Sequence, residues 1–462
     1  MSKPRSLYAP AGFLTREESE AIARRALAAA KADETTVYVT SNSRSNTRFA
    51  ENQVSTSGDN YDAEIWVRSV FGKRVADAST NKLDDASLAA LVARSESFAR
   101  LAPEDPELMP VLGPQTYQTR PDPAQVETPA PEQRAAAVRA VTEPARAAGL
   151  VSTGYMQSSV GSYAIANNKG LFAYSRSSNA AMSTTVRTPD GTGSGWAGAA
   201  HDEWSQVDAA ALGARAIDKA VRSRNPVAVE PGRYTVILEP TAVANLVQLV
   251  RGSLSARSAD EGRSFFSKPG GGTKIGTKVV DERVTIVSDP MDPEGRGGGR
   301  FSAGMFTGEG MPTERVVWIE NGIVKNLAYD RFWAQKQGVR PTASAGALRM
   351  SGGDATIEQM IASTERGILV TRLWYIRGVD PRTILYTGLT RDGTFLVENG
   401  RITKAIKNFR WNESPIFMLN NIEMIGRPMR VNSSEGGEGG GVVIVPPIKA
   451  RDFNFTSLSD AV

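Results

Sequence analysis

Three two-residue turns constrain the fold of this chain more than any other feature of its sequence. Asn321-Gly322, Asp392-Gly393 and Asn399-Gly400 each lie between segments in which apolar and polar residues alternate. Asn-Gly and Asp-Gly favour the type I′ turn, whose twist matches that of two antiparallel strands. Alternation with a period of two is typical of a strand with one buried face. We therefore expect the chain after Glu261 to be mostly antiparallel sheet, closed as a barrel or packed as a sandwich.

The beginning of the chain predicts a unit of helices and strands. Thr15 and Glu18 form a capping box at the start of a helix. Segments rich in Val, Thr, Ile and Tyr follow over 35–79 and are separated by turn residues, which indicates antiparallel strands. A second helix is expected over 84–101, where Asp84 and Asp85 lie at the positive end of the helix dipole.

The same order of elements returns later in the chain. A helix is predicted from Pro131, strands over 150–188 with a hairpin turn at 167–170, and a helix over 205–224. Helix, strands and helix thus occur twice. The repetition hints at a duplicated unit of helices and antiparallel strands.

Proline and turn residues suggest where the chain divides. Prolines recur through 102–131, which predicts an extended connector inside the first domain. Asn225-Pro226 begins a second break, which ends at Gly232. We therefore expect an α+β protein with an N-terminal α/β domain over 1–225 and a β-rich C-terminal domain over 226–462.

Composition excludes several classes of function. The 462 residues carry a net charge of +4, contain no cysteine and include one histidine. Disulfides, iron–sulfur clusters and thiolate nucleophiles are thereby excluded, and a reducing cytoplasm is the expected compartment. The mild positive charge forms no basic run, so we expect no nucleic acid partner. The N-terminus has no secretory h-region, and no apolar stretch is long enough to span a membrane.

Candidates for catalysis are few. His201 has Asp202 beside it and Ser194 seven residues before it, but a Ser–His–acid site also requires these groups to converge in space. His201 as a surface or interface residue is the simpler interpretation. Asp289, Asp292 and Glu294 form the densest acidic loop, which lacks calcium-loop spacing and is best explained as a turn after a strand. A metal site built only from oxygen ligands remains an alternative.

An ordered series of segments resembles the TldD/PmbA family, a metallopeptidase-like family also named for modulation of DNA gyrase. The resemblance covers nearly the whole chain and is strongest from Val207 onward. It rests on the order and spacing of these segments: VEPGRYTVILEPTAVANLV, KIGTKVVDERVTIVSDP, GEGMPTERVVWIENGIVKNLAYDR, GRITKAIKNFRWNESP, NNIEMIG and VIVPPIKARDFNFTS. The resemblance implies that 226–462 is equivalent to the peptidase domain of the family and that the protein dimerises.

The resemblance also implies a metal site that this chain lacks. The TldD-like branch carries H-E-x-x-x-H on the helix after the VILEP-like strand, and a cysteine ligand in a Gly-rich segment near the C-terminus. Here that helix contains no histidine and the segment SSEGGEGGG contains no cysteine. The chain therefore resembles the PmbA (TldE) branch. The region that replaces the site contains five polar or charged residues: Arg251, Ser255, Arg257, Glu261 and Arg263.

One helix is expected to carry this altered region. Apolar residues recur at three- and four-residue spacing between Thr241 and about Ser258, which predicts one apolar stripe on one packed helix. The stripe consists of Val243, Leu246, Val247, Val250 and Leu254. The arginines around its end are expected either to repel zinc and pair with acids of a peptide or partner, or to be solvated surface residues.

These expectations support one main hypothesis and two alternatives. The first is a non-catalytic subunit, with no cofactor of its own, that pairs with a TldD-like zinc subunit and guides unfolded or precursor peptides. A sheet edge could hold such a peptide as an added strand. The alternatives are a self-sufficient hydrolase that uses His201 or carboxylates, and a peptide-binding homodimer.

Overall fold

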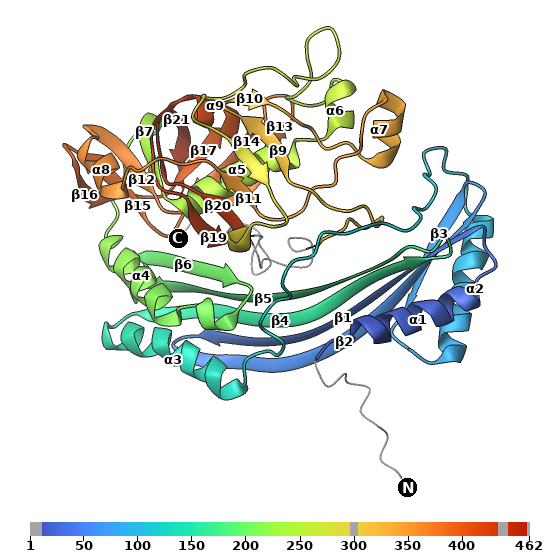
Figure 1. Cartoon of the computed structure of the whole chain (residues 1–462). Helices are drawn as coiled ribbons and strands as arrows, with labels where there is room; N and C mark the ends of the chain where they lie inside the picture. Colours follow the sequence, from blue (N-terminus) through green and yellow to red (C-terminus); the bar gives the residue numbers. More distant parts are fainter. Residues whose placement is uncertain (1–11, 296–303, 433–441, 460–462) are drawn as a thin grey trace.

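One six-stranded antiparallel sheet carries the N-terminal half of the chain in the computed structural model, which describes residues 12–295, 304–432 and 442–459 (Figure 1). Its strands follow the order β3-β2-β1-β4-β5-β6. The elements of this half are α1 (Arg16–Ala28), β1 (Glu34–Ala50), β2 (Gln53–Phe71), β3 (Arg74–Thr80), α2 (Asp85–Leu101), α3 (Pro131–Ala147), β4 (Val151–Asn167), β5 (Phe172–Arg187), β6 (Ser194–His201) and α4 (Ala209–Arg222).

The sheet confirms the repeated order of elements. Each half consists of a helix, three antiparallel strands and a helix. The first strands of the halves, β1 and β4, pair at the centre of the sheet, with β2 and β3 on one side and β5 and β6 on the other. The two units therefore continue a single sheet instead of forming two separate ones.

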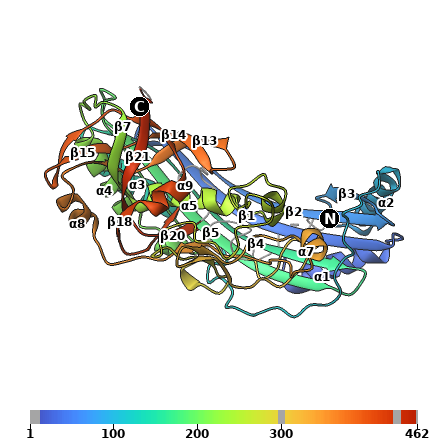
Figure 2. The ribbon, with the colours of Figure 1, turned by 90° about the horizontal axis from the view of Figure 1, so that it is seen from above.

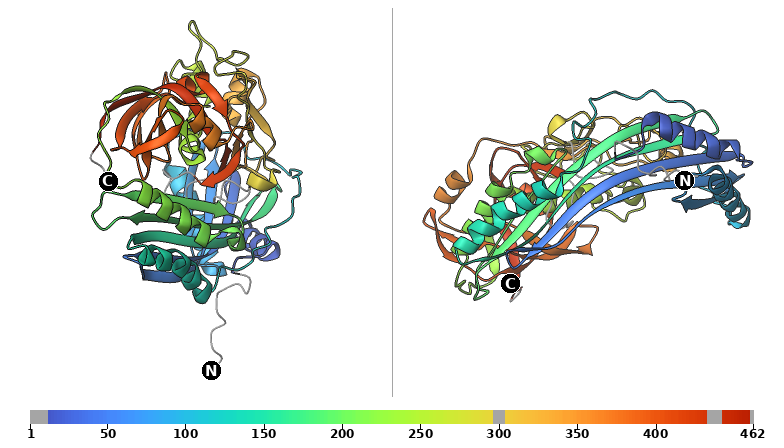
Figure 3. Two further views of the ribbon diagram at one scale, coloured as in Figure 1. Left: turned by 90° about the vertical axis from the view of Figure 1, so that its left-hand side faces the viewer. Right: turned by 90° about the horizontal axis from the view of Figure 1, so that it is seen from below.

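Both faces of this sheet are covered, because its strands alternate side chains between them. On β4, Ala164 packs in a cluster with residues of α1 and α2, whereas the next residue, Ile165, packs with Phe306 from the C-terminal half. On β5, Met182 packs with α3 and α4, whereas Ala181 belongs to a cluster that includes Val442 of the C-terminal half. Helices thus cover one face and the C-terminal half covers the other, as Figure 3 shows.

The C-terminal half folds into two further sheets with open edges. One contains β10-β9-β8-β11-β20-β19, and the other follows the path β13-β14-β17-β21-β7-β12-β15-β16, with β18 beside β21. Their strands are β7 (Gly232–Leu238), β8 (Ile286–Ser288), β9 (Val316–Glu320), β10 (Ile323–Val324), β11 (Leu348–Met350), β12 (Arg366–Val370), β13 (Leu373–Asp380), β14 (Leu385–Thr390), β15 (Thr394–Glu398), β16 (Arg401–Ala405), β17 (Phe409–Glu413), β18 (Ile422–Ile425), β19 (Met429–Asn432), β20 (Val442–Val445) and β21 (Ile448–Leu458).

The predicted α+β class is therefore confirmed, and of the two arrangements left open the sandwich fits. Neither C-terminal sheet closes into a barrel over the described ranges. Most pairs are antiparallel, whereas β7–β12 and β11–β20 are parallel. Short helices lie among the strands: α5 (Pro240–Gly252), α6 (Ala256–Asp260), α7 (Arg331–Gln337), α8 (Ile357–Ala362) and α9 (Pro415–Asn420).

Helix α5 lies in the core that the two C-terminal sheets share. Ala242, Val243, Ala244, Leu246 and Val247 are all fully buried, and they cluster with residues of both sheets. A helix that is apolar all round is a buried helix. The prediction of a single apolar stripe on a helix from Thr241 to Ser258 is thus wrong in two respects. Buried residues lie on more than one side of α5, and the helix ends at Gly252.

Two of the three turn predictions are confirmed and one is wrong. Asn321-Gly322 joins the paired strands β9 and β10, and Asn399-Gly400 joins β15 and β16. Asp392-Gly393 also has positive φ angles but lies between β14 and β15, which are not neighbours in the sheet. Its sequence specified the local backbone, but the Asp392 carboxylate is buried against Arg372 and Ser194.

The proline-rich connector runs between the two halves (Figure 1) and follows one long edge of the molecule when it is seen from above (Figure 2). From Pro106 to Ala130 it contains no helix or strand. Tyr117 donates a hydrogen bond from its hydroxyl to the carbonyl of Gly310, at 2.8 Å, and Arg120 donates to the carbonyl of Pro290, at 3.2 Å. The connector therefore fastens the C-terminal half onto the N-terminal sheet. None of the described helices combines the length and hydropathy that a membrane crossing requires.

Candidate functional site

The altered region begins where α5 stops. Ser253 caps α5, and Ser255 begins α6 by accepting a hydrogen bond from the Ser258 N–H, at 3.2 Å. Between the helices the backbone pairs with Ala328, which donates to the Leu254 carbonyl and accepts from the Ala256 N–H. This extended segment satisfies the backbone groups that a continuous helix would have satisfied internally. The pairing with Ala328 therefore stabilises the break between α5 and α6.

Ion pairs occupy the region after the break. Arg257 donates two hydrogen bonds to the carboxylate of Glu107, at 2.7 and 2.8 Å, and a third to Glu261, at 3.0 Å. Arg263 also pairs with Glu261, which lies two residues before it. The hydrogen bond to Glu107, followed by that to Glu261, raises the pKa of Arg257. The bonds from Arg263 and Arg257 lower the pKa of Glu261, so this carboxylate is ionised and engaged.

Trp333 of α7 closes the other side of this cluster. Its indole N–H donates to the Asp260 carboxylate, at 2.7 Å. The guanidinium of Arg257 lies over its ring at 5.1 Å from the centroid, and the ammonium of Lys336 at 4.6 Å. Cations at this distance from an indole face are held by its quadrupole. Arg251, in the last turn of α5, is exposed at the negative end of the helix dipole.

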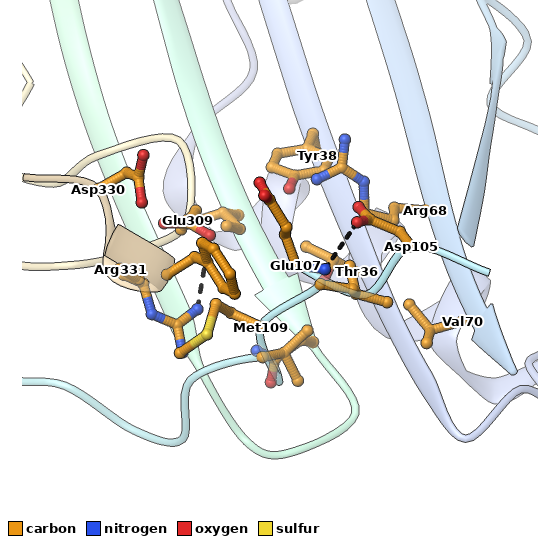
Figure 4. Close-up of a pocket in the computed structure, with 15 residues that line it drawn as sticks. Thr36, Tyr38, Arg68, Val70, Asp105, Glu107, Met109, Glu309, Asp330 and Arg331 are labelled. Atoms are coloured by element: carbon orange, nitrogen blue, oxygen red, sulfur yellow. Dashed lines mark hydrogen bonds and ion pairs between the residues drawn. The ribbon is translucent and has the colours of Figure 1, made fainter. Parts of the chain in front are cut away.

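Glu107 also lines a cavity of about 350 Å³ between the two halves of the molecule (Figure 4). Tyr38 of β1 and Arg68 of β2 contribute one wall, the connector contributes Asp105, and the start of α7 contributes its cap Asp330 and its first residue Arg331. This volume is at the lower end of the range for small-molecule sites. The side chains in Figure 4 come from segments that are far apart in the sequence.

The charged groups of this cavity are already engaged in contacts within the protein. Arg68 pairs with Asp77, at 2.8 Å, and Arg331 lies 3.5 Å from the carboxylate of Glu309. The Asp330 carboxylate caps α7 by accepting the Trp333 N–H, at 2.7 Å. Burial raises the pKa of Tyr38, so its hydroxyl stays protonated at neutral pH. The cavity can bind polar groups, but its carboxylates are held in structural contacts and not poised as general bases.

The residues of the altered region do not fit a zinc ion. Zinc is held by nitrogen, sulfur and carboxylate donors, usually four in number. Here two guanidinium groups, those of Arg257 and Arg263, flank the carboxylate of Glu261, and Arg257 also holds that of Glu107. Over the described ranges 12–295, 304–432 and 442–459, no three His, Cys, Asp or Glu side chains gather in a way that could hold a metal ion. The Gly-rich segment over 433–441 lies outside the described residues.

The candidate catalytic residues on β6 do not converge. Ser194 and His201 are the first and last residues of this strand, which at ~3.3 Å per residue places them more than 20 Å apart. Ser194 donates to the Asp392 carboxylate, at 2.6 Å. His201 Nδ1 lies 2.7 Å from Asp202 and accepts the Glu203 N–H. Burial, together with the charge of Arg430, lowers the pKa of His201. The hypothesis of a Ser–His–acid site is therefore wrong for these residues.

Replacing the histidine tests this conclusion. We expect His201→Ala to leave within about threefold the kcat/KM of the two-subunit peptidase that the family resemblance implies, because a true general base contributes about 10²–10⁴ in rate. Peptide cleavage would be measured alongside size-exclusion elution, which checks that the complex is intact. A hundredfold fall in an intact complex would restore His201 as a catalytic residue.

The acidic loop after β8 is a turn held by Arg349 and by backbone hydrogen bonds. Arg349 donates to Asp292, at 2.8 and 3.1 Å, and to Glu294, at 2.6 Å. The Asp289 carboxylate accepts the N–H of Met291. These contacts engage the carboxylates that an oxygen-only metal site would need, and they agree with the interpretation as a turn.

Sequence reasoning missed the partners that define the altered region. Glu107 lies 150 positions before Arg257, in a connector whose composition indicated only an extended chain. Glu107 lies close to two other acidic residues, Glu104 and Asp105, and this acidic segment was the one sign of an ion pair in the sequence. That signal could not identify the arginine that it meets.

Comparisons with known proteins place this geometry in context. Three family models match consecutive parts of the chain: PmbA/TldA metallopeptidase domain 1 over 36–99, the central domain over 122–224 and the C-terminal domain over 231–457. The Pro-rich connector falls largely between the first two matches.

Curated relatives resemble part of the chain. A metalloprotease of Methanothermobacter thermautotrophicus is 25% identical over 265 residues, which are 52% of this chain and 54% of the relative. A zinc metalloprotease TldD homolog of Saccharolobus solfataricus is 26% identical over 239 residues, 48% of this chain and 51% of the relative. The chain spans about half the length of the curated relatives it matches.

A solved structure shares the fold over nearly the full chain. TldE from Thermococcus kodakarensis superposes with a TM-score of 0.82 at 19% identity, covering 95% of this chain and 99% of the other. At this identity the likeness concerns the fold.

Proposed function

Because this chain belongs to the PmbA/TldD metallopeptidase family, we propose that it is the subunit without its own zinc site in a two-subunit peptidase that acts on unfolded or precursor peptides. The observation that carries the proposal is the cluster of Arg257, Glu107, Glu261 and Arg263 after the broken helix. In this proposal the cluster replaces the metal site that the TldD-like branch has.

The chemistry of the chain supports this division of labour. One histidine in 462 residues, and no cysteine, leaves a single nitrogen or sulfur donor for zinc. Glu261 could deprotonate a metal-bound water only if a metal were held beside it, and its carboxylate instead accepts hydrogen bonds from two arginines. Zinc and catalysis are thus assigned to a TldD-like partner subunit, and this chain to shaping the path of the peptide.

The proposal also includes a cellular compartment and a path for the peptide. The complex would work in the cytoplasm, in keeping with a sequence free of cysteine. The peptide would reach the zinc of the partner along this chain, which would contribute a surface that selects extended chains. A homodimer that binds peptides without cleaving them is the principal alternative assembly.

Co-expression tests the proposal. The purified chain alone is expected to cleave an unstructured fluorogenic peptide at least about a hundredfold more slowly than the same chain co-purified with an H-E-x-x-x-H protein from its native host, because a general base alone is worth about 10²–10⁴. Two matched changes sharpen the test. Glu261→Gln in this chain should leave the rate of the complex within about threefold, whereas the same change in the H-E-x-x-x-H motif of the partner should abolish cleavage.

Other outcomes would contradict the proposal in distinct ways. Cleavage by the chain alone, retained after chelation, would point to a self-sufficient hydrolase. A stable homodimer that captures no partner from the host would point to the stand-alone peptide-binding protein.

A further inference from the structure

A groove of about 580 Å³ lies between β6 and the C-terminal half, apart from the altered region. Its walls are β6, one side of α4, the first turn of α5 and the edge strand β19. In Figure 1, β6 and α4 lie directly beneath the C-terminal sheets, next to β19. We call this space the β6 groove. Its volume is within the range of ligand-binding clefts.

The outer edge of β6 faces this groove. Among the described strands β6 pairs with β5 alone, so half of its backbone groups point away from the sheet. The hairpin closes with a hydrogen bond from the Thr188 N–H to the Gly193 carbonyl, at 2.9 Å. Because inward and outward residues alternate along an antiparallel pair, the residues whose backbone points outward are Ser194, Trp196, Gly198 and Ala200.

Side chains close the two ends of this edge. The Ser223 hydroxyl accepts the N–H of Ser194 and donates to its carbonyl, both at 2.9 Å. At the other end, Arg430 of β19 donates from Nε to the Ala200 carbonyl, at 2.8 Å. These contacts also confirm the alternation, since each uses a group that should point outward.

The middle of the edge stays open. Over the described part of the chain, no group forms a hydrogen bond with the outward N–H or carbonyl of Trp196 or Gly198. Gly198 has no side chain to block approach, and the Trp196 ring lies against it so closely that an added Cβ would be 2.5 Å from the indole. The guanidinium of Arg372 lies over the Trp196 ring, 4.6 Å from its centroid. The window of four backbone groups is therefore fixed in position.

The charges around the window favour an acidic ligand. Lys219 of α4 pairs with Glu239, at 2.6 Å, and Arg222 pairs with Asp218, at 3.1 Å. Arg215, one turn earlier on α4, is exposed in the groove and has no ion-pair partner among the described residues. The 13-residue helix α5 also begins at the groove, with its positive end there and no side-chain cap from Glu239.

We propose that the β6 groove binds an extended acidic peptide as an added strand, held by the backbone of Trp196 and Gly198 and by the charge of Arg215. The inference rests on the proposed function, because it takes the ligand to be the unfolded peptide. Backbone pairing is indifferent to side chains, so the groove would accept many sequences in one extended conformation. An acidic side chain or a C-terminal carboxylate would add affinity beside Arg215.

Hydrogen exchange of the full-length chain tests the backbone contact. The probe is an unstructured decapeptide of Ser, Thr and Ala with two glutamates, present at saturation. We expect the amides of Trp196 and Gly198 to exchange at least about tenfold more slowly with peptide, because each gains a hydrogen bond. The amides of Ala197 and Ala199, already bonded to β5, should not change. Protection elsewhere, or none at these two amides, would overturn the proposal.

A matched pair of charge reversals tests the ionic contact. Arg215→Glu should weaken binding of the glutamate peptide about tenfold and favour a lysine version of it, as fluorescence anisotropy would measure. Arg139→Glu makes the same change on the exposed side of α3, outside the groove, and should have no effect. Equal effects of the two variants would refute the role of Arg215.

A third probe separates backbone pairing from charge. A glutamate peptide methylated at alternate backbone nitrogens keeps its charge but loses donors on one edge, so its affinity should fall about tenfold or more. Unchanged affinity would overturn the strand model. These readouts need no catalytic partner. A chain that assembles into an active complex but fails them loses only this inference, and a chain that passes them but forms no active complex with an H-E-x-x-x-H protein contradicts the two-subunit function.

Discussion

Asp392→Ala should lower the free energy of unfolding by about 3–5 kcal/mol, the cost typical of removing one partner from a buried ion pair. The Asp392 carboxylate is 1% exposed and pairs with the guanidinium of Arg372, which is 8% exposed. It also accepts the hydroxyl hydrogen bond of Ser194, at 2.6 Å. Alanine would leave a buried cation and a buried hydroxyl without this acceptor. Urea unfolding followed by tryptophan fluorescence measures the loss.

A double variant distinguishes the cost of an unpaired charge from the worth of the pair. Arg372→Met combined with Asp392→Leu removes both charges and keeps apolar volume, so it should recover at least about half of the loss, as replacements of buried pairs by apolar residues often do. A loss under about 1 kcal/mol in Asp392→Ala would show that this contact is not a buried ion pair in solution.

This ion pair also joins the two halves of the molecule. Arg372 lies over the ring of Trp196 from β6, at 4.6 Å, and over that of Trp374 from β13, at 4.7 Å. Asp392 reaches Ser194 at the start of the same strand. The contact thus fixes β6, whose open edge we propose as the peptide window. We expect peptide binding to weaken in Asp392→Ala even where the protein remains folded.

Local signals in the sequence predicted much of the fold. The Thr15 side chain accepts the Glu18 N–H and the Glu18 carboxylate accepts the Thr15 N–H, as the capping box required. Asn321-Gly322 and Asn399-Gly400 form hairpins because their turn geometry is set within two residues. The repeated order of elements predicted the two halves of the sheet. These features depend on short sequence separations, where composition and spacing carry the information.

Features that depend on distant residues could not be predicted in the same way. Asp392-Gly393 has the turn sequence of a hairpin, yet the strands on its two sides pair with other strands, and Asp392 is buried against Arg372, 20 positions before it. The helix from Thr241 was predicted to continue past Gly252, but pairing with Ala328 interrupts it. The sequence did identify the altered region by its missing ligands. It could not reveal that Glu107 from the connector would neutralise Arg257 there.

The C-terminal half contains one carboxylate whose ionisation should control stability near neutral pH. Glu413 of β17 is 4% exposed. Its two oxygens accept the backbone N–H groups of Ser414, at 2.7 Å, and Asn454, at 3.1 Å. These bonds and the charge of Arg233 favour the ionised form, but burial outweighs them and raises the pKa of Glu413 to about 7. The folded protein therefore holds this proton more tightly than the unfolded chain does.

The free energy of unfolding should accordingly fall as pH rises from 5 to 8. Glu413 contributes its full stability below its unfolded pKa of about 4.5 and loses it as pH passes the folded value of about 7, a change of up to roughly 3 kcal/mol. Glu413→Gln cannot ionise, so its urea midpoint should show a smaller fall, and at pH 8 the variant should be the more stable protein. The exposed Glu230→Gln is the matched control and should follow the wild type. His201, whose lowered pKa gives the opposite trend, is present in all three proteins, so their differences isolate Glu413. Parallel pH profiles for wild type and Glu413→Gln would show that this carboxylate is ionised throughout the range and that its backbone bonds, not burial, decide its state.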